Sequence, residues 1–583
     1  MVRLAAGRRI VVLLMLLAIL GGHTVFTLAY ATGPIVLGSD SRSSDADFVI
    51  GAHGSKFYVL NQKTRKSDYS SDATTVIQKA LSTVASAGGK VFITAGTYPV
   101  TRIVVTGTNV TLESEFAVLI ASDKGISTRR FSSSIQKSDG TQTLEVLDSA
   151  PVVLVDRATD VRLRRIVIDG NPLSRAFHRD GILIWDSRLV LVEKCEIRNV
   201  EGSAIRTRSS GTYDLANAQN SSLKTTDVVV KESSVRNTRT NVGPPIVKGF
   251  GYEIEFSDKV TIESSVAENC AESMFRSHYS RHVNFLNNIG STILRVTSGE
   301  VFDLYRSDYV VVKGNRMFDP KGLGIYIYEY STNLLVESNE IRSLSPESAQ
   351  VRLEGIGKYR SAPIENIIFR NNSISGTVQL SNSYLRNVRF EGNTLYSLRA
   401  WPAEETPRVL EGIYFVSNNF TARNVQAGIV SIPIAIINST FFNRVEVRES
   451  TTGIVVFEGN EFTSDGFAYS TGIYIAGSVE YVKVTHNYFH DVTYQAVFVS
   501  VDVGLSQNGL IEIVGNRFKN NGFAGPQDTI VLKTSSVIKI MITNNQFEST
   551  PGSFTMYLSN ADGTVADNVM DKPIWWQPPS ALA

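Results

Sequence analysis

Cysteine is scarce in this chain, which has only Cys195 and Cys270 among its 583 residues. A dense disulfide framework, the usual support of small exported domains, is therefore excluded. No spacing motif links the two cysteines, and we expect two buried free thiols. A surplus of charge is missing as well, because 57 Lys and Arg side chains face 56 Asp and Glu side chains. Proteins that bind nucleic acid concentrate a basic excess on one face, so a nucleic-acid partner is not expected.

Long hydrophobic runs are absent after the first thirty residues. Three arginines within residues 3–9 precede the apolar stretch 10–20, and Ala29-Tyr30-Ala31 supplies small residues for cleavage. This order is typical of a secretory signal peptide, so we expect residues 1–31 to be removed and the protein to be secreted or held at the cell surface. The stretch 11–30 is also about long enough to span a bilayer, which leaves an uncleaved anchor, and with it a membrane contact, open.

What the sequence does contain is a repeated phrase. From about residue 285 onward, an apolar pair, one or two small or polar residues, Asn, any residue and then Phe, Ile, Leu or Met recur, as in VESNEI at Val336 and FEGNEF at Phe457. Most gaps between the aligned asparagines are 21 to 33 residues, and the one gap of 42 is bisected by Asn438. The aligned residues are Asn287, Asn315, Asn339, Asn372, Asn393, Asn418, Asn460, Asn487, Asn516, Asn545 and Asn568. Periods of this size are typical of solenoids.

Within each period the apolar residues alternate over short runs, as in Ile511-Glu512-Ile513-Val514, which is the pattern of a strand. Stacked parallel coils place equivalent residues ~4.8 Å apart. A repeated Asn at one turn can then bond to the Asn above and below, and Asn tolerates the left-handed conformation of a tight bend. The sequence therefore predicts an all-β fold, a parallel β-helix.

One segment has helical spacing instead. Val76, Ile77, Ala80, Leu81 and Val84 recur behind Ser71 and Asp72, which can cap a helix, and the segment ends at Gly88-Gly89. We predict a helix over 71–87 that covers the open first coil, since solenoid ends expose apolar surface without a cap. The predicted division is a signal peptide at 1–31, an N-terminal extension at 32–70, the β-helix at 71–572 and a C-terminal tail at 573–583.

The stretch 72–110, with its phrase ATTVIQKALSTVASAGGKVFITAGTYPV, resembles the opening of the pectin-lyase-like β-helix superfamily, in particular its rhamnogalacturonase, pectate-lyase-3 and epimerase-like group. Ile168-Asp169-Gly170-Asn171 and Asp180-Gly181-Ile182 are also similar to coil phrases of that group. The resemblance implies a right-handed β-helix of three sheets. It also implies cleavage or modification of an acidic polysaccharide by hydrolysis, elimination or epimerisation.

The chain departs from this family at its catalytic motifs. The Asp-Asp pair, Gly-His-Gly and Arg-Ile-Lys of polygalacturonase-type hydrolases are missing from the sequence, and so is the Asp-Pro-His-Asp of alginate epimerases. One fold hosts many chemistries, so the resemblance transfers no catalytic residue.

Aligning the central strands by their inward-facing residues indicates one outward face rich in charge. On it, Leu183 and Trp185 are followed on successive coils by Arg206 with Arg208, Glu253 with Glu255, Arg276 with His278, Asp303 with Tyr305, and Tyr326 with Tyr328 and the nearby Glu329. Carboxylates and cations would then lie ~5 Å apart on adjacent coils, with aromatic rings at both ends.

Such a face suits a polysaccharide ligand. Sugar rings would stack on Trp185, Tyr305 or Tyr326, and Arg206 or Arg276 would hold a uronate carboxylate. A hydrolase needs two carboxyl groups, which Glu253, Glu255 and Asp303 supply. A lyase or epimerase needs a base, for which His278 or Tyr305 serves, and an Arg or Ca²⁺ to neutralise the substrate carboxylate. No bound metal or other cofactor is predicted, and Ca²⁺ is left open for the lyase route.

A second interpretation treats the same residues as a charge ladder that only pairs its own members along the sheet. Likewise, ordinary turn chemistry accounts for His178-Arg179-Asp180, with Asp180 bonding local backbone. Two hypotheses follow: an exported carbohydrate-active enzyme of the hydrolase, lyase or epimerase type, and a non-catalytic surface protein that binds glycan or has a structural role.

Overall fold

The computed structural model describes residues 43–577 except for several short internal segments. The segments outside the description are 124–126, 172–178, 239–248, 292–299, 321, 346–347, 355–362, 382–383, 402–409, 422–423, 429–433, 443, 449–453, 465–470, 477–480, 502–508, 523–527 and 550–553. The signal peptide or anchor predicted at 1–31 lies outside the described residues. Within them, no helix combines the length and apolar character that a membrane crossing requires.

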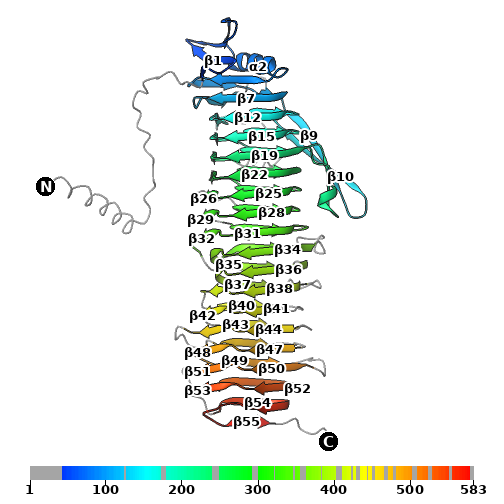
Figure 1. Cartoon of the computed structure of the whole chain (residues 1–583), viewed down its shortest axis with the longest axis vertical. Helices are drawn as coiled ribbons and strands as arrows, with labels where there is room; N and C mark the ends of the chain where they lie inside the picture. The colour runs from blue at the N-terminus through cyan, green and yellow to red at the C-terminus, as the bar shows by residue number, and fades with distance from the viewer. Residues whose placement is uncertain are drawn as a thin grey trace, which may run out of the picture. The chain divides into compact units, whose positions relative to one another are not determined.

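The chain winds into coils of three strands, and each strand pairs in parallel with its counterpart on the next coil (Figure 1). One coil consists of β14 (Ile182–Trp185), β15 (Arg188–Glu193) and β16 (Glu196–Arg198). The alternation of apolar and polar residues predicted this arrangement, because side chains of alternate residues point to opposite faces of a strand. The inward residues of all coils form one continuous hydrophobic core that runs from Ile50 to Ala561.

Stacking of the coils produces three ladders of strands. The first ladder, which carries the charged face, contains β6 (Ile103–Val105), β11 (Val153–Asp156), β14, β17 (Ile205–Arg208), β21 (Tyr252–Glu255), β24 (Phe275–His278), β27 (Phe302–Tyr305), β30 (Ile325–Tyr328) and β33 (Ala349–Glu354).

The second ladder contains β1 (Phe48–His53), β4 (Gly89–Ile93), β7 (Thr108–Ser114), β12 (Thr159–Arg164), β15, β19 (Thr225–Lys231), β22 (Ser257–Glu263), β25 (Arg281–Leu286), β28 (Asp308–Lys313), β31 (Thr332–Glu337), β34 (Pro363–Arg370), β36 (Tyr384–Glu391), β38 (Leu410–Val416), β41 (Ile434–Ile437), β44 (Ile454–Glu458), β47 (Tyr481–Thr485) and β50 (Leu510–Val514).

The third ladder contains β5 (Thr97–Val100), β8 (Val118–Ala121), β13 (Val167–Asp169), β16, β20 (Ser234–Arg236), β23 (Val266–Glu268), β26 (Ile289–Ser291), β29 (Arg316–Phe318), β32 (Glu340–Arg342), β39 (Asn419–Phe420), β42 (Thr440–Phe442), β45 (Glu461–Thr463), β48 (Tyr488–His490), β51 (Arg517–Lys519) and β53 (Gln546–Glu548). The long strands β35 (Ser373–Ser381) and β37 (Thr394–Trp401) join the third ladder to the first.

The first ladder continues through β40 (Asn424–Gly428), β43 (Arg444–Arg448), β46 (Ile473–Ala476) and β49 (Val497–Val501), after which β52 (Ile530–Thr543) and β54 (Met556–Ala566) span the first and second ladders. The last strand, β55 (Ile574–Gln577), pairs with β54, so the sheet reaches into the segment 573–583 that was expected to be a tail.

The predicted capping helix is present as α2 (Ala73–Val84), whose first turn is capped by the Asp72 carboxylate bonding to the backbone N–H groups of Thr74 and Thr75. Its buried face, which includes Ile77 and Leu81, is part of the main core. The extension 32–70 also holds structure, because β1, β2 (Lys56–Asn61) and β3 (Ser67–Ser70) form an antiparallel meander and β1 pairs with β4.

The predicted asparagine ladder lies at the turn between the second and third ladders, with two corrections. Asn288 occupies the ladder position in place of Asn287, and Ser439 occupies it in place of Asn438. The reason is that the turn needs two residues: the first adopts positive φ, as Asn287 and Asn438 do, and the second turns its side chain into the stack. At Asn487, the side-chain oxygen accepts from the backbone N–H of Asn460 at 2.9 Å and from its Nδ2 at 2.9 Å.

A hairpin interrupts the regular winding between β8 and β11. Its strands β9 (Arg129–Gln136) and β10 (Gln142–Ser149) pair in antiparallel fashion and, with β18 (Thr212–Asp214), form a separate small sheet beside the coils (Figure 1). Phe131 and Leu147 of the hairpin pack on the outward residues Leu154, Leu183 and Trp185 of the first ladder. The hairpin therefore covers the outer face of the ladder just before the charged coils begin.

Candidate functional site

The charged face has the register that the sequence predicted. One column on the first ladder runs Leu183, Arg206, Glu253, Arg276, Asp303 and Tyr326, and its neighbour runs Trp185, Arg208, Glu255, His278, Tyr305 and Tyr328. We call these the first and second columns. The strand pairing thus brings the predicted residues together, while their chemical roles stay predictions.

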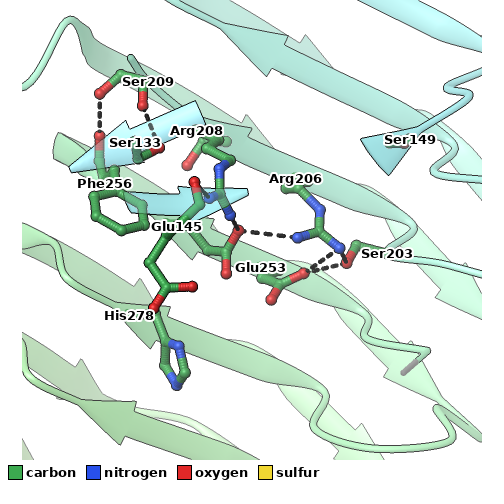
Figure 2. Close-up of polar contacts among 12 residues, drawn as sticks. Ser133, Glu145, Ser149, Ser203, Arg206, Arg208, Ser209, Glu253, Phe256 and His278 are labelled. Carbon is green, nitrogen blue, oxygen red and sulfur yellow. Dashed lines mark hydrogen bonds and ion pairs between the residues drawn. The ribbon is translucent and has the colours of Figure 1, made fainter. Parts of the chain in front are cut away.

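Arg206 organises the upper part of the columns. Its Nη2 lies 2.8 Å from Glu253 Oε2 (Figure 2). Its Nη1 lies 2.9 Å from Glu255 Oε2 and its Nε lies 3.4 Å from Asp180 Oδ1, while Arg208 Nη1 lies 2.6 Å from the same Glu255 oxygen. Arg206 is 3% exposed and Glu253 is 1% exposed. These ion pairs are therefore buried, and Arg206 is fully committed to protein carboxylates.

Asp180 belongs to this network, which the sequence did not indicate. Its Oδ1 accepts from the backbone N–H of Ser203 on the next coil at 2.8 Å, and its Oδ2 accepts from the Ser149 hydroxyl at 2.6 Å. These bonds reach the next coil and the hairpin instead of the local backbone that was predicted, and Asp180 also pairs with Arg206.

Environment separates the two glutamates. Burial would raise the pKa of Glu255, but the charges of Arg208 and Arg206 hold that pKa far below its usual range. Burial raises the pKa of Glu253 despite the opposing charge of Arg206. Glu253 also accepts a short hydrogen bond from Ser203 Oγ. Glu253 pairs with Arg206 and Arg276, and Glu255 pairs with Arg206 and Arg208, so each carboxylate is held by two arginines.

The lower part of the columns is more accessible. Arg276 bridges Glu253 (Nη1–Oε1, 2.7 Å) and Asp303 (Nε–Oδ2, 3.2 Å), and its Nη2 lies 2.9 Å from His278 Nδ1. Arg276 and the tyrosines below it are half-buried, whereas Glu253 is fully buried. Because both of its edges are engaged, Arg276 cannot hold a substrate carboxylate without releasing its own partners.

Glu300 is the residue that sequence reasoning missed. It comes just before β27 and accepts from Ser273 Oγ at 3.3 Å, and the same hydroxyl lies 3.2 Å from Asp303 Oδ2. Burial, followed by the negative charge of Asp303, raises the pKa of Glu300 to about 7. The available signal was its position three residues before Asp303, but the column pattern covers only residues inside strands, and Glu300 lies in a turn.

Tyrosines line the lower end of the face. The rings of Tyr305 and Tyr328 stack with centroids 4.5 Å apart, those of Tyr326 and Tyr328 with centroids 4.4 Å apart, and the Tyr326 hydroxyl donates to Glu354 at 2.9 Å. Burial, with the neighbouring Tyr279 second, raises the pKa of Tyr305 far above its ordinary value. Tyr305 therefore stays protonated, which argues against its predicted role as a base.

Trp185 does not offer the sugar platform expected from the sequence. Its ring is 4% exposed and packs against Phe131 of the hairpin with centroids 4.9 Å apart. Because β9 and β10 cover this end of the columns, an aromatic surface remains only at the tyrosine end. The sequence could not predict this burial, since the residues of the hairpin do not indicate which part of the β-helix the hairpin packs against.

The two cysteines are free and buried, as predicted. Burial raises the pKa of each thiol to about 12. Within the described part of the chain, no group of three or more His, Cys, Asp and Glu side chains is arranged to hold a metal ion.

Comparisons with known proteins bear mainly on the fold. The family model described as "Right handed beta helix region" matches residues 101–289 and 151–341, the part of the chain that contains the charged columns. A search of curated proteins finds no match to the sequence.

Among solved structures, the chain is similar to the A-module of a mannuronan C-5 epimerase of Azotobacter vinelandii, at 14% identity and TM-score 0.33, covering 74% of this chain and 94% of that one. It is similar to a polygalacturonase from Erwinia carotovora, at 14% identity and TM-score 0.31, covering 71% and 91%. It is also similar to PfbA, a surface adhesin of Streptococcus pneumoniae, at 13% identity and TM-score 0.36, covering 75% and 90%. Scores this low carry no argument about function.

The family match and the three parallel ladders agree with each other, and both agree with the coil phrases of the sequence. The chain therefore folds as a right-handed parallel β-helix, and its residues 101–341 match the family model of that name.

Proposed function

We propose that this protein is an exported enzyme that hydrolyses a polysaccharide at Glu300 and Asp303. The observation that carries the proposal is the sharing of one hydroxyl, Ser273 Oγ, by two carboxyl groups in different environments. Burial raises the pKa of Glu300 to about 7, while Arg276 holds a positive charge 3.2 Å from Asp303. Glycoside cleavage uses two carboxyl groups, of which one is protonated and serves as the acid while the other is ionised and serves as the base or nucleophile.

In this proposal Glu300 protonates the glycosidic oxygen, and the bond from that oxygen to the anomeric carbon breaks. Asp303 attacks the anomeric carbon to form a glycosyl ester. Water then displaces Asp303 from that carbon, and the Glu300 carboxylate takes a proton from the water, which restores both groups. Two oxygens at 3.3 and 3.2 Å from one hydroxyl lie no more than about 6.5 Å apart, which is below the usual spacing of an inverting pair and favours retention.

The tyrosines supply the platform for the sugar. Tyr305, Tyr326 and Tyr328 are half-buried. Tyr305 shares β27 with Asp303, and Tyr326 and Tyr328 lie on the adjacent strand β30, where Tyr326 is opposite Asp303. Arg352 and Glu354 on the following coil extend the polar surface. Elimination is less well supported, because Tyr305 stays protonated and Arg276 is committed to Glu253 and Asp303.

The test is a combined assay of reducing ends and of absorbance at 235 nm on a panel of uronate-containing and neutral polysaccharides, with and without Ca²⁺. We expect reducing ends without absorbance, and a loss of roughly 100-fold or more for Glu300→Gln. Glu340→Gln, which alters a surface carboxylate on the third ladder, is the matched control and should stay within twofold of the parent.

The pH dependence adds a second readout. Glu300 must carry its proton to act as an acid, and its pKa is about 7, so activity should fall as the pH rises above about 7. A rise in absorbance at 235 nm would show that the reaction is an elimination and would overturn the proposed hydrolysis. Full activity of Glu300→Gln would remove Glu300 from the mechanism.

A non-catalytic glycan-binding role is the second candidate, and it is favoured by the ion pairs that Arg206, Arg208 and Arg276 make with protein carboxylates. In that case the columns are a structural charge ladder and the tyrosines are a binding surface. Binding of a polysaccharide without cleavage, weakened by Tyr326→Ala and unaffected by Glu300→Gln, would select this candidate.

A further inference from the structure

Two arginines near the hairpin end of the first ladder lack the short carboxylate contacts that the column arginines make. Arg179, three residues before β14, is 2% exposed, and its Nε and Nη1 atoms have no hydrogen-bond partner. Its remaining nitrogen, Nη2, donates to the backbone oxygen of Ser122 at 3.2 Å and lies 3.6 Å from Asp123 Oδ1. Arg102, directly before β6, also has a buried Nε without a partner, while its Nη2 donates to the Ser127 carbonyl.

The electrostatics of this pair point the same way. Burial, and then the charge of Arg129, lower the pKa of Arg102, and burial lowers the pKa of Arg179, with Arg102 adding to the effect. Asp123 and Glu201 act in the opposite direction on Arg179 but do not cancel the shift. By contrast, surrounding carboxylates raise the pKa of Arg206 and of Arg276 above the ordinary value.

A buried guanidinium without acceptors is costly, because its charge has left water and found no replacement. Buried polar groups are almost always bonded, and an exception calls for a missing partner such as an ion. Asp123 does not fill this role, since its oxygen is 3.6 Å away, compared with 2.6 to 2.9 Å in the closest contacts of Arg206 and Arg208. The free donors of Arg179 and Arg102 therefore lack an acceptor that carries negative charge.

We propose that Arg102 and Arg179 form an oxyanion-binding site, which takes a carboxylate or sulfate group carried by an acidic glycan. Guanidinium groups match such planar or tetrahedral oxyanions better than any other side chain does. Arg102 is half-buried and Arg179 is buried, so Arg102 is the more accessible of the two. The assignment of the anion to a glycan rests on the proposed function, whereas the anion site itself does not.

The site lies at a distance from the reacting carboxyls. Four strand steps separate β14, which Arg179 precedes, from β27, which carries Asp303, so the two coils are roughly 20 Å apart at ~4.8 Å per step. The hairpin covers the outer face of the first ladder at Leu183 and Trp185 on β14 itself. Arg102 and Arg179 thus provide a second contact for an acidic ligand, outside the charged columns.

The experiment measures binding of sodium sulfate, of a galacturonate oligomer and of a neutral oligosaccharide of equal length to the full chain, by calorimetry and by thermal shift at low salt. We expect the two anionic probes to bind and stabilise the protein, the neutral probe to bind at least tenfold more weakly than the galacturonate oligomer, and the anion effect to weaken as salt is added. Sulfate alone would indicate a sulfated ligand, and the galacturonate oligomer alone a uronate.

Arg179→Met and Arg102→Met should each weaken anion binding roughly tenfold or more, and the half-buried position of Arg102 keeps the test valid if Arg179→Met fails to fold. Arg198→Met, which changes a surface arginine paired with Asp169, is the control and should bind like the parent. Equal anion binding by the parent and Arg102→Met would overturn the site, and so would the absence of any anion effect. Glu300→Gln separates the two proposals, because it should abolish activity and leave anion binding intact.

Discussion

The coils up to Ser265 and those from Asn288 onward share one backbone plan but hold it together by different means. At the turn between the second and third ladders, the earlier coils place Cys195, Ser233 and Ser265, and the later ones place asparagines from Asn288 onward. Ser265 accepts one bond through its side chain, from the backbone N–H of Ser233 at 3.2 Å. Asn487 accepts two bonds and donates two, to Phe457 O and to Asn516.

The interior of the later coils is equally regular. One phenylalanine per coil stacks on the next in nearly parallel fashion, with centroids 4.6 to 5.0 Å apart, in the series Phe420, Phe441, Phe462, Phe489, Phe518 and Phe547. The earlier coils place ion pairs on the outer face of the first ladder and cover part of that face with a hairpin. The hairpin and the buried pairs of Arg206 and Arg208 thus lie in the earlier coils, and the regular phenylalanine stack lies in the later ones.

The largest effect should come from removing the charge that the earlier coils depend on. Arg206→Met leaves Asp180, Glu253 and Glu255 buried without that guanidinium, which should cost roughly 3–5 kcal/mol of unfolding free energy. Arg198→Met removes a surface pair and should cost about 0–1 kcal/mol. Thermal unfolding together with limited proteolysis of the hairpin measures both, and equal stability of the two variants would show that the buried network contributes nothing.

The turn position itself offers the direct comparison. Asn487→Ala removes four side-chain hydrogen bonds inside the stack and should cost about 3 kcal/mol, because buried backbone and amide groups then lose their partners. Ser265→Ala removes two and should cost about 1 kcal/mol. Hydrogen exchange of the neighbouring turns locates each loss on its own coils. A larger loss at Ser265 would reverse the proposed difference between the two regions.

The amino-acid sequence predicts these two regions unequally well. The later coils are predicted closely because each repeats the same phrase, and the errors, Asn287 and Asn438, come from a turn of two residues in which both positions favour Asn. The columns were placed correctly because strand alternation determines which side chains share a face. Glu300, Asp180 and the burial of Trp185 were not predicted, since they depend on turns and on a hairpin that obey no repeat.

The smallest effect should come from repairing the one serine in the asparagine ladder. Asn418 lacks an amide partner on the next coil, because the backbone N–H of Asn418 donates to Ser439 Oγ at 3.1 Å and its Nδ2 turns to the carbonyl of Val416 at 3.2 Å instead. Ser439→Asn provides the missing acceptor, so it should add about 0.5–1 kcal/mol and raise the midpoint of thermal unfolding by no more than about 2 °C. In Ser265→Asn, the new side chain meets Ser233 on one neighbouring coil, and Ser233 has no side-chain amide to donate to it. This substitution should therefore add less unfolding free energy than Ser439→Asn. If Ser265→Asn stabilised the protein as much as Ser439→Asn, Asn would be favoured at this turn whatever residues lie on the neighbouring coils. The hydrogen bonds between stacked asparagines would then add no stability. A gain confined to Ser439→Asn would show that the ladder is cooperative, because each Asn then stabilises the protein through its bonds to the asparagines on the neighbouring coils.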